Sequence, residues 1–132
     1  MRHPAPPDAW LHTARSFLES SCVTPLPLEQ LAAQLGVSRY HLIHAFRRAW
    51  GVTPHQYRTR QRIERAKALL ATSDLTVTEI CFAVGFHSPG SFSALFRRAV
   101  GQPPRGYRLH ARRRDHAIAR VIPLCLRMMY AA

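Results

Sequence analysis

Residues 28–58 of the chain recur as residues 77–108, and this internal repeat constrains the fold more than any other feature. The copies align at an offset of 49 in their first part, where Gly36 corresponds to Gly85, and at an offset of 50 after one inserted residue. The matches in the second part are Phe46, Arg47, Arg48, Ala49, Gly51, Pro54, Tyr57 and Arg58 with Phe96, Arg97, Arg98, Ala99, Gly101, Pro104, Tyr107 and Arg108. Such a repeat predicts two structural units of the same design.

Each copy has the pattern of a short helix, a turn at a glycine and a longer helix. Four apolar residues of the first copy are spaced as on one helix face: Leu28, Leu31, Ala32 and Leu35. Gly36 ends this helix, Ser38 is a suitable N-cap for the next, and Gly51 ends that one. The longer helix is expected to bury Leu42, Ala45, Phe46 and Ala49. The stripe on its opposite side is Tyr40, Ile43, His44 and Arg47.

The second copy follows the same plan. Thr76 and Glu79 form a Thr-x-x-Glu capping box at the start of its short helix. Gly85 makes the turn, Ser88 can cap the longer helix, and Pro89 stands at the first helical position. The expected core residues of this copy are Val77, Ile80, Cys81, Val84, Phe92, Leu95, Phe96 and Ala99.

Further helices are predicted before, between and after the copies. Residues 8–21 carry an apolar stripe formed by Trp10, Ala14, Phe17 and Leu18. Residues 55–70 contain no glycine or proline, which predicts a long linker helix over 54–71. Its inward residues are Ile63, Ala66 and Leu70. Pro104 opens a short helix expected to end near His110. Because no segment alternates as a strand does, we predict an all-α fold of about seven helices, with two helix-turn-helix subdomains joined by the linker helix.

The chain is strongly basic, with 19 Lys and Arg against 7 Asp and Glu and a formal net charge of +12. Because 47% of its residues are hydrophobic, we expect a folded protein rather than a disordered basic tail. A folded basic domain indicates a polyanionic partner, and nucleic acid is the first candidate. Composition alone equally fits an architectural DNA-binding protein or a basic subunit of a larger assembly.

Other classes of protein find little support in the sequence. Glycine-rich phosphate loops and the Gly-x-Ser-x-Gly and His-Glu-x-x-His motifs are absent, so no enzyme activity is expected. Cys22, Cys81 and Cys125 stand far apart, and His41 and His44 lack a third ligand, so we expect no metal and no cofactor. The sequence has no signal peptide and no run of 18 uncharged apolar residues. We therefore expect no membrane contact and a cytoplasmic, nucleoid-associated bacterial protein.

A helix, a tight turn and a second helix with one buried and one exposed stripe is the pattern of the helix-turn-helix motif, whose second helix enters the major groove of DNA. Two such motifs on a basic chain predict binding to double-stranded DNA. The 18 residues of the linker helix would span about 27 Å, which is comparable with the ~34 Å between successive major grooves on one face of the duplex. A monomer is therefore enough to insert the second helix of each motif into a major groove. The possibility of a dimer formed through the C-terminal tail stays open.

Residues 14–108 resemble the DNA-binding domain of AraC/XylS-type transcription regulators. The resemblance is carried by LEQLAAQLGVSRYHLIHAFRRAWGVTPHQYRTRQRIERAKALL at 28–70 and by VTEICFAVGFHSPGSFSALFRRAVGQPPRGYR at 77–108. It implies seven helices, two recognition helices in adjacent major grooves, and control of transcription. In this family control is most often activation through contact with RNA polymerase.

The resemblance also implies a division of the chain. We expect a flexible N-terminus (1–8), a double helix-turn-helix DNA-binding domain (9–110) and a tail that is first basic and then apolar (111–132). Within the domain, the first unit is 28–50, the linker helix 54–71 and the second unit 77–100.

Carried over by position, the resemblance names the residues that would contact DNA. The base-facing residues are Arg39, Tyr40, Ile43, His44 and Arg47 in the first recognition helix and Gly90, Ser93, Ala94 and Arg97 in the second. The phosphate contacts are Ser38, Arg48, Arg58, Arg62, Ser88, Ser91 and Arg98. The second set departs from the family pattern, in which a basic residue is common where Ala94 stands. We therefore predict that the first unit makes most polar base contacts and that the second mainly binds phosphates.

Four questions stay open at this point. A sequence-specific regulator is the favoured interpretation, and a non-specific architectural DNA-binding protein is the other. Only 13 residues precede the matched region, so we expect no effector domain and a monomer controlled by its abundance, unless the chain belongs to a longer regulator. Residues 117–132 are expected to pack on the domain or to contact a partner. The arginine run 112–114 is either a solvated face or a non-specific attractor of phosphate.

Overall fold

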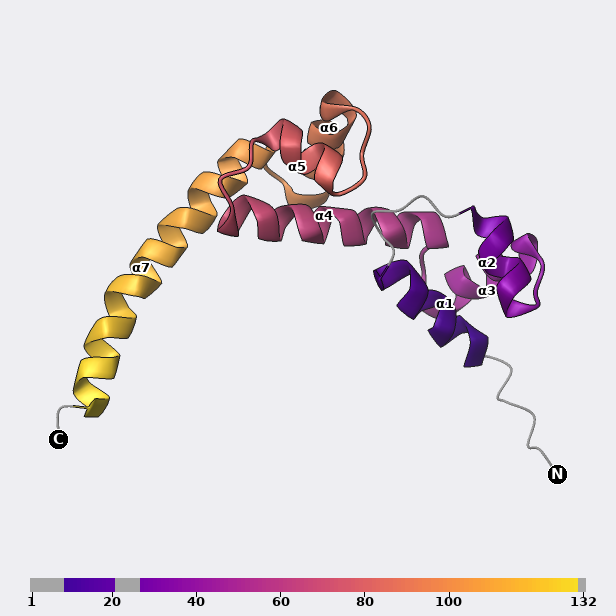
Figure 1. The fold of residues 1–132 in the computed structure, drawn as a ribbon, viewed down its shortest axis with the longest axis horizontal. Coiled ribbons are helices and arrows are strands. Elements are labelled where there is room, and N and C mark those ends of the chain that lie inside the picture. Colours follow the sequence, from indigo (N-terminus) through magenta and orange to yellow (C-terminus); the bar gives the residue numbers. More distant parts are fainter. Residues whose placement is uncertain (1–8, 21–26, 131–132) are drawn as a thin grey trace. The chain divides into compact units, whose positions relative to one another are not determined.

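The computed structural model describes residues 9–20 and 27–130, with side chains described for 9–20 and 27–117. Within these ranges there are seven α-helices and no strand (Figure 1): α1 (Ala9–Ser20), α2 (Leu28–Leu35), α3 (Arg39–Trp50), α4 (Pro54–Thr72), α5 (Val77–Ala83), α6 (Pro89–Val100) and α7 (Pro104–Tyr130). This confirms the predicted all-α fold. The chain divides into two compact units, Met1–Glu64 and Arg65–Ala132, with the boundary inside α4. The expected flexible segment 1–8 lies outside the described residues.

The first unit is held together by an apolar core between α1, α2 and α3. Its buried residues are Leu11, Ala14, Leu18, Leu31, Ala32, Leu42 and Phe46. The ring of Phe46 lies 4.5 Å from that of Trp50 and 5.5 Å from that of Tyr57. Leu11 was not in the predicted stripe of the first helix, whereas Trp10, which was, is only half-buried. The core otherwise follows the predicted apolar faces.

The second unit repeats this design with α5, α6 and the start of α7. The rings of Phe92 and Phe96 are fully buried and 5.8 Å apart, and Phe96 lies 5.7 Å from Tyr107. Residues 91–100 have the same pattern of burial, position by position, as residues 41–50. Cys81 is fully buried, and burial raises the pKa of its thiol. This supports its expected role as a packing residue.

The helix ends are set by local hydrogen bonds that the sequence mostly predicted. Ser38 Oγ accepts a hydrogen bond from the backbone N–H of His41 at 3.0 Å, and Ser88 Oγ accepts one from Ser91 at 3.4 Å. The Thr76–Glu79 capping box is formed in both directions, at 3.1 and 2.9 Å. Gly36 and Gly51, expected to end helices, have φ of 71° and 74°, and their counterparts Gly85 and Gly101 in the second copy have φ of 99° and 90°. A side chain at these positions would be strained.

A further capping box begins α4 and was missed. The Thr53 hydroxyl accepts from the backbone N–H of Gln56 at 3.2 Å, and the Gln56 side chain accepts from the N–H of Thr53 at 3.0 Å. The Thr-x-x-Gln spacing around Pro54 was the available signal.

Two expectations about helix residues are wrong. The helix that begins at Pro104 does not end near His110 but continues to Tyr130, so the expected tail 111–132 is largely helical. The helices α3 and α6 each end at a glycine, but no glycine follows Gly106 in the sequence, so α7 has no such residue to end it near His110.

Ala49 and Ala99, expected in the core, are exposed. Both stand in the last turn of their helix, and Ala49 lines an open hollow of about 450 Å³ between α1 and α3.

The C-terminal end of α4 is held by Arg108, a role that the sequence did not reveal. Its guanidinium donates to the carbonyl oxygens of Leu70 at 3.1 Å and Ser73 at 3.4 Å, and also to that of Leu75. Carbonyls at the end of a helix have no partner within the helix and carry partial negative charge. Arg108 therefore joins α7 to the segment that leads into α5.

Replacing Arg108 with alanine is expected to destabilise the second unit by about 1–3 kcal/mol, since the partly buried carbonyls of Leu70 and Ser73 lose a charged donor. Arg108→Lys should recover only part of this, because one ammonium cannot match the planar fork of donors. Urea unfolding measures the loss. Arg105→Ala, an exposed change in the same helix, is the control and should stay within about 0.5 kcal/mol of the parent. Equal stability of the Arg108→Ala and Arg105→Ala variants would contradict the assignment.

Candidate nucleic-acid interface

The longer helix of the first unit, α3, exposes most of the residues predicted to face bases. Arg39, Tyr40, His44 and Arg47 are exposed, and Ile43 is half-buried. The side chain of Tyr40 is 72% exposed, which is unusual for a large aromatic ring and leaves it available to a partner. Leu42 and Phe46 anchor the other side of the helix in the core. The helix therefore presents a polar stripe on a rigid base.

Two side-chain contacts arrange this stripe. The rings of Tyr40 and His44, one helical turn apart, have centroids 3.9 Å from each other. The guanidinium of Arg39 lies 3.2 Å from the carboxylate of Glu29 in α2. Both partners of this ion pair are more than half exposed, so it contributes little to stability and can open when a stronger anion approaches.

The longer helix of the second unit, α6, presents a smaller surface. Gly90, Ala94 and Arg97 are exposed, and Ser93 is half-buried. Arg97 is the only one of these predicted base-facing residues with a long side chain. Small side chains let a helix backbone approach a partner closely.

The residues predicted to contact phosphate fall into two groups. Those fully on the surface are Ser38, Arg48, Ser88, Ser91 and Arg98. Arg58 and Arg62 are half-buried in α4 and already interact within the protein. Arg47, Arg48, Arg97 and Arg98 lie in the last turns of their helices, where positive charge is favourable next to the helix dipole.

Tyr57 of α4 packs against α3 through its ring, which lies 5.5 Å from that of Phe46. Its hydroxyl donates to the carboxylate of Glu19 and accepts from Arg15 Nε at 3.2 Å. The hydrogen bond from Tyr57 lowers the pKa of Glu19. Burial raises the pKa of Tyr57, and the hydrogen bond to Glu19 raises it further. These contacts tie α1 to α4 around the ring of Phe46.

Two other kinds of site are not found in the part of the chain that the structure describes. No three His, Cys, Asp or Glu side chains gather there as a metal ion would require. The ring of His41 packs against Trp10 at 5.3 Å, whereas that of His44 packs against Tyr40. No helix among the described residues is long and apolar enough to cross a membrane.

Comparison with known proteins gives concordant results. A family profile described as a helix-turn-helix domain matches residues 31–110. The HTH-type transcriptional activator RhaS of Klebsiella pneumoniae is 37% identical over 101 residues, which are 76% of this chain and 36% of RhaS. A transcriptional regulator with an AraC-type DNA-binding domain from Chromobacterium violaceum has a TM-score of 0.73 at 31% identity, over 77% of this chain and 91% of that one. The DNA-binding domain of the global transcriptional factor AdpA, solved with a target DNA, has a TM-score of 0.72 at 34% identity, over 79% of this chain and 94% of that one.

The two units, each with a recognition helix exposed on one side, define a helix-turn-helix DNA-binding domain. The chain belongs to the AraC/XylS-type family of such domains, which confirms the predicted resemblance. It spans about a third of the length of the RhaS proteins that it matches, 36% in each case.

Proposed function

We propose that this protein binds specific sites on double-stranded DNA and regulates transcription, as an activator that contacts RNA polymerase. The proposal is carried by the repeated exposure of a polar, basic helix face on a chain with a net charge of +12. The name of RhaS, a transcriptional activator, supports the sign of regulation. We place this activity on the bacterial chromosome in the cytoplasm, with no cofactor.

On DNA, we propose that α3 and α6 enter successive major grooves. The helix α4 has 19 residues and is therefore about 28 Å long, close to the ~34 Å that separates major grooves on one side of the duplex. Because one chain holds both recognition helices, a monomer provides both insertions.

We further propose that the two units divide the work of recognition. The exposed polar side chains of α3 can form hydrogen bonds with base edges, and its Arg47 suits guanine. Most of the exposed residues of α6 are too small to reach a base edge with a polar group, so this helix mainly brings its backbone and serines to phosphates.

Single substitutions on the two recognition helices test this division. Alanine at Tyr40, His44 or Arg47 is expected to reduce discrimination between the right and wrong base pair in the first half-site by about 1–3 kcal/mol where a contact is lost. Ser93→Asn should change discrimination less. The measurement is a set of affinities for duplexes that differ by one base pair from a site obtained by in vitro selection. Equal discrimination in both half-sites would contradict the unequal division.

Footprinting separates the regulator from an architectural DNA-binding protein. A regulator with two recognition helices protects a defined site of roughly 20 base pairs, about two turns of the duplex. Protection without a preferred register on any sequence would reject the sequence-specific function and support the architectural one.

A further inference from the structure

The helix α7 begins like α4, but its later residues differ in character from their counterparts. At the offset of 50 that relates the copies, Ile63 and Ala66 of α4 correspond to Arg113 and His116 of α7. Ile63 is 3% exposed and Ala66 is fully buried, whereas Arg113 and His116 are both exposed. A face that is apolar and buried in α4 is therefore basic and exposed in α7. Such a face is unsuited to covering another apolar surface.

One arginine of the run in α7 forms an ion pair and a hydrogen bond within the protein, and the other two form neither among the described residues. Arg112 lies 2.8 Å from the carboxylate of Asp74 and also donates to a backbone carbonyl of the same segment. Arg113 and Arg114 are exposed, and no hydrogen bond or ion pair holds them within the described residues. Asp115, the only acidic residue of 104–117, stands two positions from Arg113 and directly after Arg114, and no ion pair joins it to either arginine within the described residues. The two charges are therefore available to an anion from outside.

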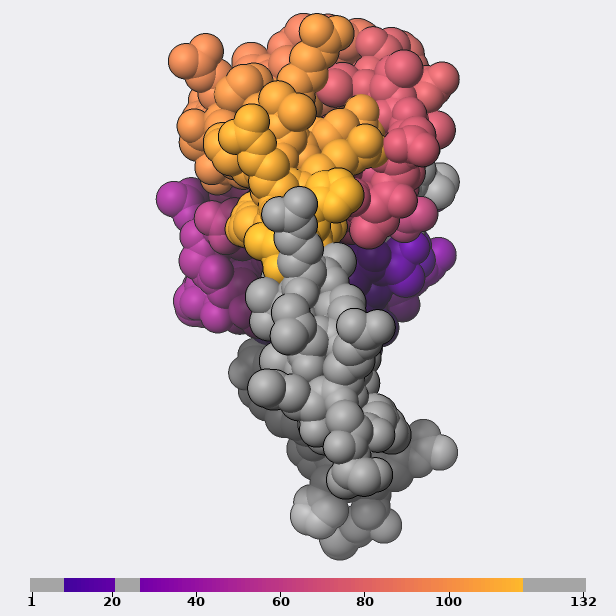
Figure 2. All heavy atoms as spheres, turned by 90° about the vertical axis from the view of Figure 1, so that its left-hand side faces the viewer, coloured from indigo at the N-terminus to yellow at the C-terminus, as the bar shows by residue number. Residues whose placement is uncertain are grey.

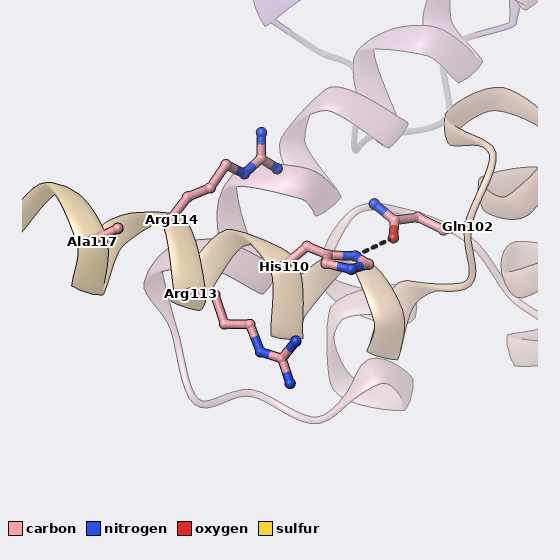
Figure 3. A pocket seen from close by; sticks show the side chains of 5 residues that line it. All are labelled: Gln102, His110, Arg113, Arg114 and Ala117. Atoms are coloured by element: carbon pink, nitrogen blue, oxygen red, sulfur yellow. Dashed lines mark hydrogen bonds between the residues drawn. The ribbon is translucent and has the colours of Figure 1, made fainter.

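These arginines line an open hollow of about 540 Å³ at the start of α7 (Figure 3). The other residues that line it are Gln102, His110 and Ala117. A hydrogen bond of 2.6 Å between the Gln102 side-chain oxygen and Nδ1 of His110 holds the imidazole in place. Arg113 and Arg114 extend in different directions from the helix (Figure 3). The amino-terminal part of α7 forms part of the outer surface of the second unit (Figure 2). An open, basic hollow of this kind suits an extended anionic chain.

The hollow is close to the recognition helix of the same unit. Gln102 directly follows Gly101, which ends α6, and the last turn of α6 carries Arg97 and Arg98. Gln102 stands four positions after Arg98, and four chain steps span at most about 14 Å. The major groove of B-DNA is about 12 Å wide, so phosphates that border a groove holding α6 would lie within this reach.

We propose that the face of α7 formed by His110, Arg113 and Arg114 is a third DNA-contacting surface, which binds backbone phosphates beside the groove that receives α6. This inference rests on the proposed DNA binding of the two helix-turn-helix units. Phosphate contacts do not depend on the base sequence, so this surface adds affinity for DNA without adding specificity.

The double variant Arg113→Gln, Arg114→Gln tests the proposal. Glutamine is a good helix former, so α7 is expected to stay intact at these exposed positions. Loss of two phosphate contacts should make the plot of log affinity against log salt concentration shallower by about 1.8. The parent should then lose about 10-fold more affinity than the variant between ~50 and ~200 mM salt. Fluorescence anisotropy with a selected site and with a random-sequence duplex of equal length measures this, and the ratio of the two affinities should not change.

Two control variants make the test specific. Arg113→Lys, Arg114→Lys keeps the charge and should keep the salt dependence. Arg60→Gln, Arg65→Gln removes two exposed charges from α4 and should leave the salt dependence unchanged.

Three results would overturn the proposal. One is an unchanged salt dependence in the Arg113→Gln, Arg114→Gln variant, and another is an equal change in the Arg60→Gln, Arg65→Gln control. The third is lost transcriptional activation with unaltered DNA binding, which would assign the surface to an acidic protein partner. A parent protein without preference for any site would instead reject the proposed function, and the phosphate contacts would still be measurable on the random duplex.

Discussion

Raising the salt concentration from about 50 to about 200 mM is expected to weaken the binding of this protein to its DNA site by about 10³–10⁵-fold. This range corresponds to 6–10 neutralised phosphates. When a basic side chain neutralises a phosphate, cations condensed on the duplex are released into solution. The arginines in the last turns of α3 and α6 are exposed, as are the serines at their N-termini. Both ends of each recognition helix therefore offer groups for phosphate.

The measurement is a titration of labelled duplex at several salt concentrations, which should give a slope of about −5 to −9 in log affinity against log salt. Arg48→Gln, Arg98→Gln, which changes one exposed arginine at the same repeat position of each unit, should make this slope shallower by about 1.8. A nearly flat dependence for the parent would mean that few phosphates are contacted, and that the charge of +12 serves another purpose.

The fold was largely predictable because its helix ends are determined by local chemistry. Ser38 and Ser88 cap the helices they precede, and Gly51 and Gly101 end those helices with positive φ. These interactions join residues a few positions apart, so their spacing is visible in the sequence. The internal repeat then allowed the two copies to support each other, since a pattern that occurs twice is less ambiguous than one that occurs once.

The wrong expectations concern features that local chemistry does not determine. The end of α7 had no glycine to mark it, so the stop expected near His110 had no local signal behind it. Ala49 has the periodicity of a core residue, but burial also requires a neighbouring helix to cover it, and the last turn of α3 extends beyond the core. Periodicity gives the direction in which a side chain points and does not say what lies there.

The candidate interface was predictable as a surface and less so as a set of contacts. Repeat and spacing indicated that Tyr40, His44 and Arg47 lie on the outer side of α3, and they are exposed. The pairing of Arg39 with Glu29 and the bonds of Arg108 to the end of α4 join residues distant in sequence. Eighteen arginines look alike in a sequence, and only the packed structure distinguishes those with internal partners from those that face solvent.

Replacing Phe96 with alanine is expected to cost the second unit about 3–5 kcal/mol of its free energy of unfolding. The ring is fully buried between Phe92 and Tyr107, so its removal leaves a cavity in a small core that has little means of closing it. Phe46→Ala should cost the first unit a similar amount, because Phe46 occupies the same repeat position and is equally buried.

Urea unfolding gives the total loss, and hydrogen exchange shows which unit has lost it. Phe96→Ala should reduce protection in α5 and α6, and Phe46→Ala should reduce it in α2 and α3. Phe82→Ala is the matched control, because the Phe82 side chain is 52% exposed and its removal should change stability by no more than about 0.5 kcal/mol. If Phe96→Ala were as mild as Phe82→Ala, the buried ring would not be what holds α6 in place, and the exposed face of that helix would lack the rigid support that DNA recognition requires.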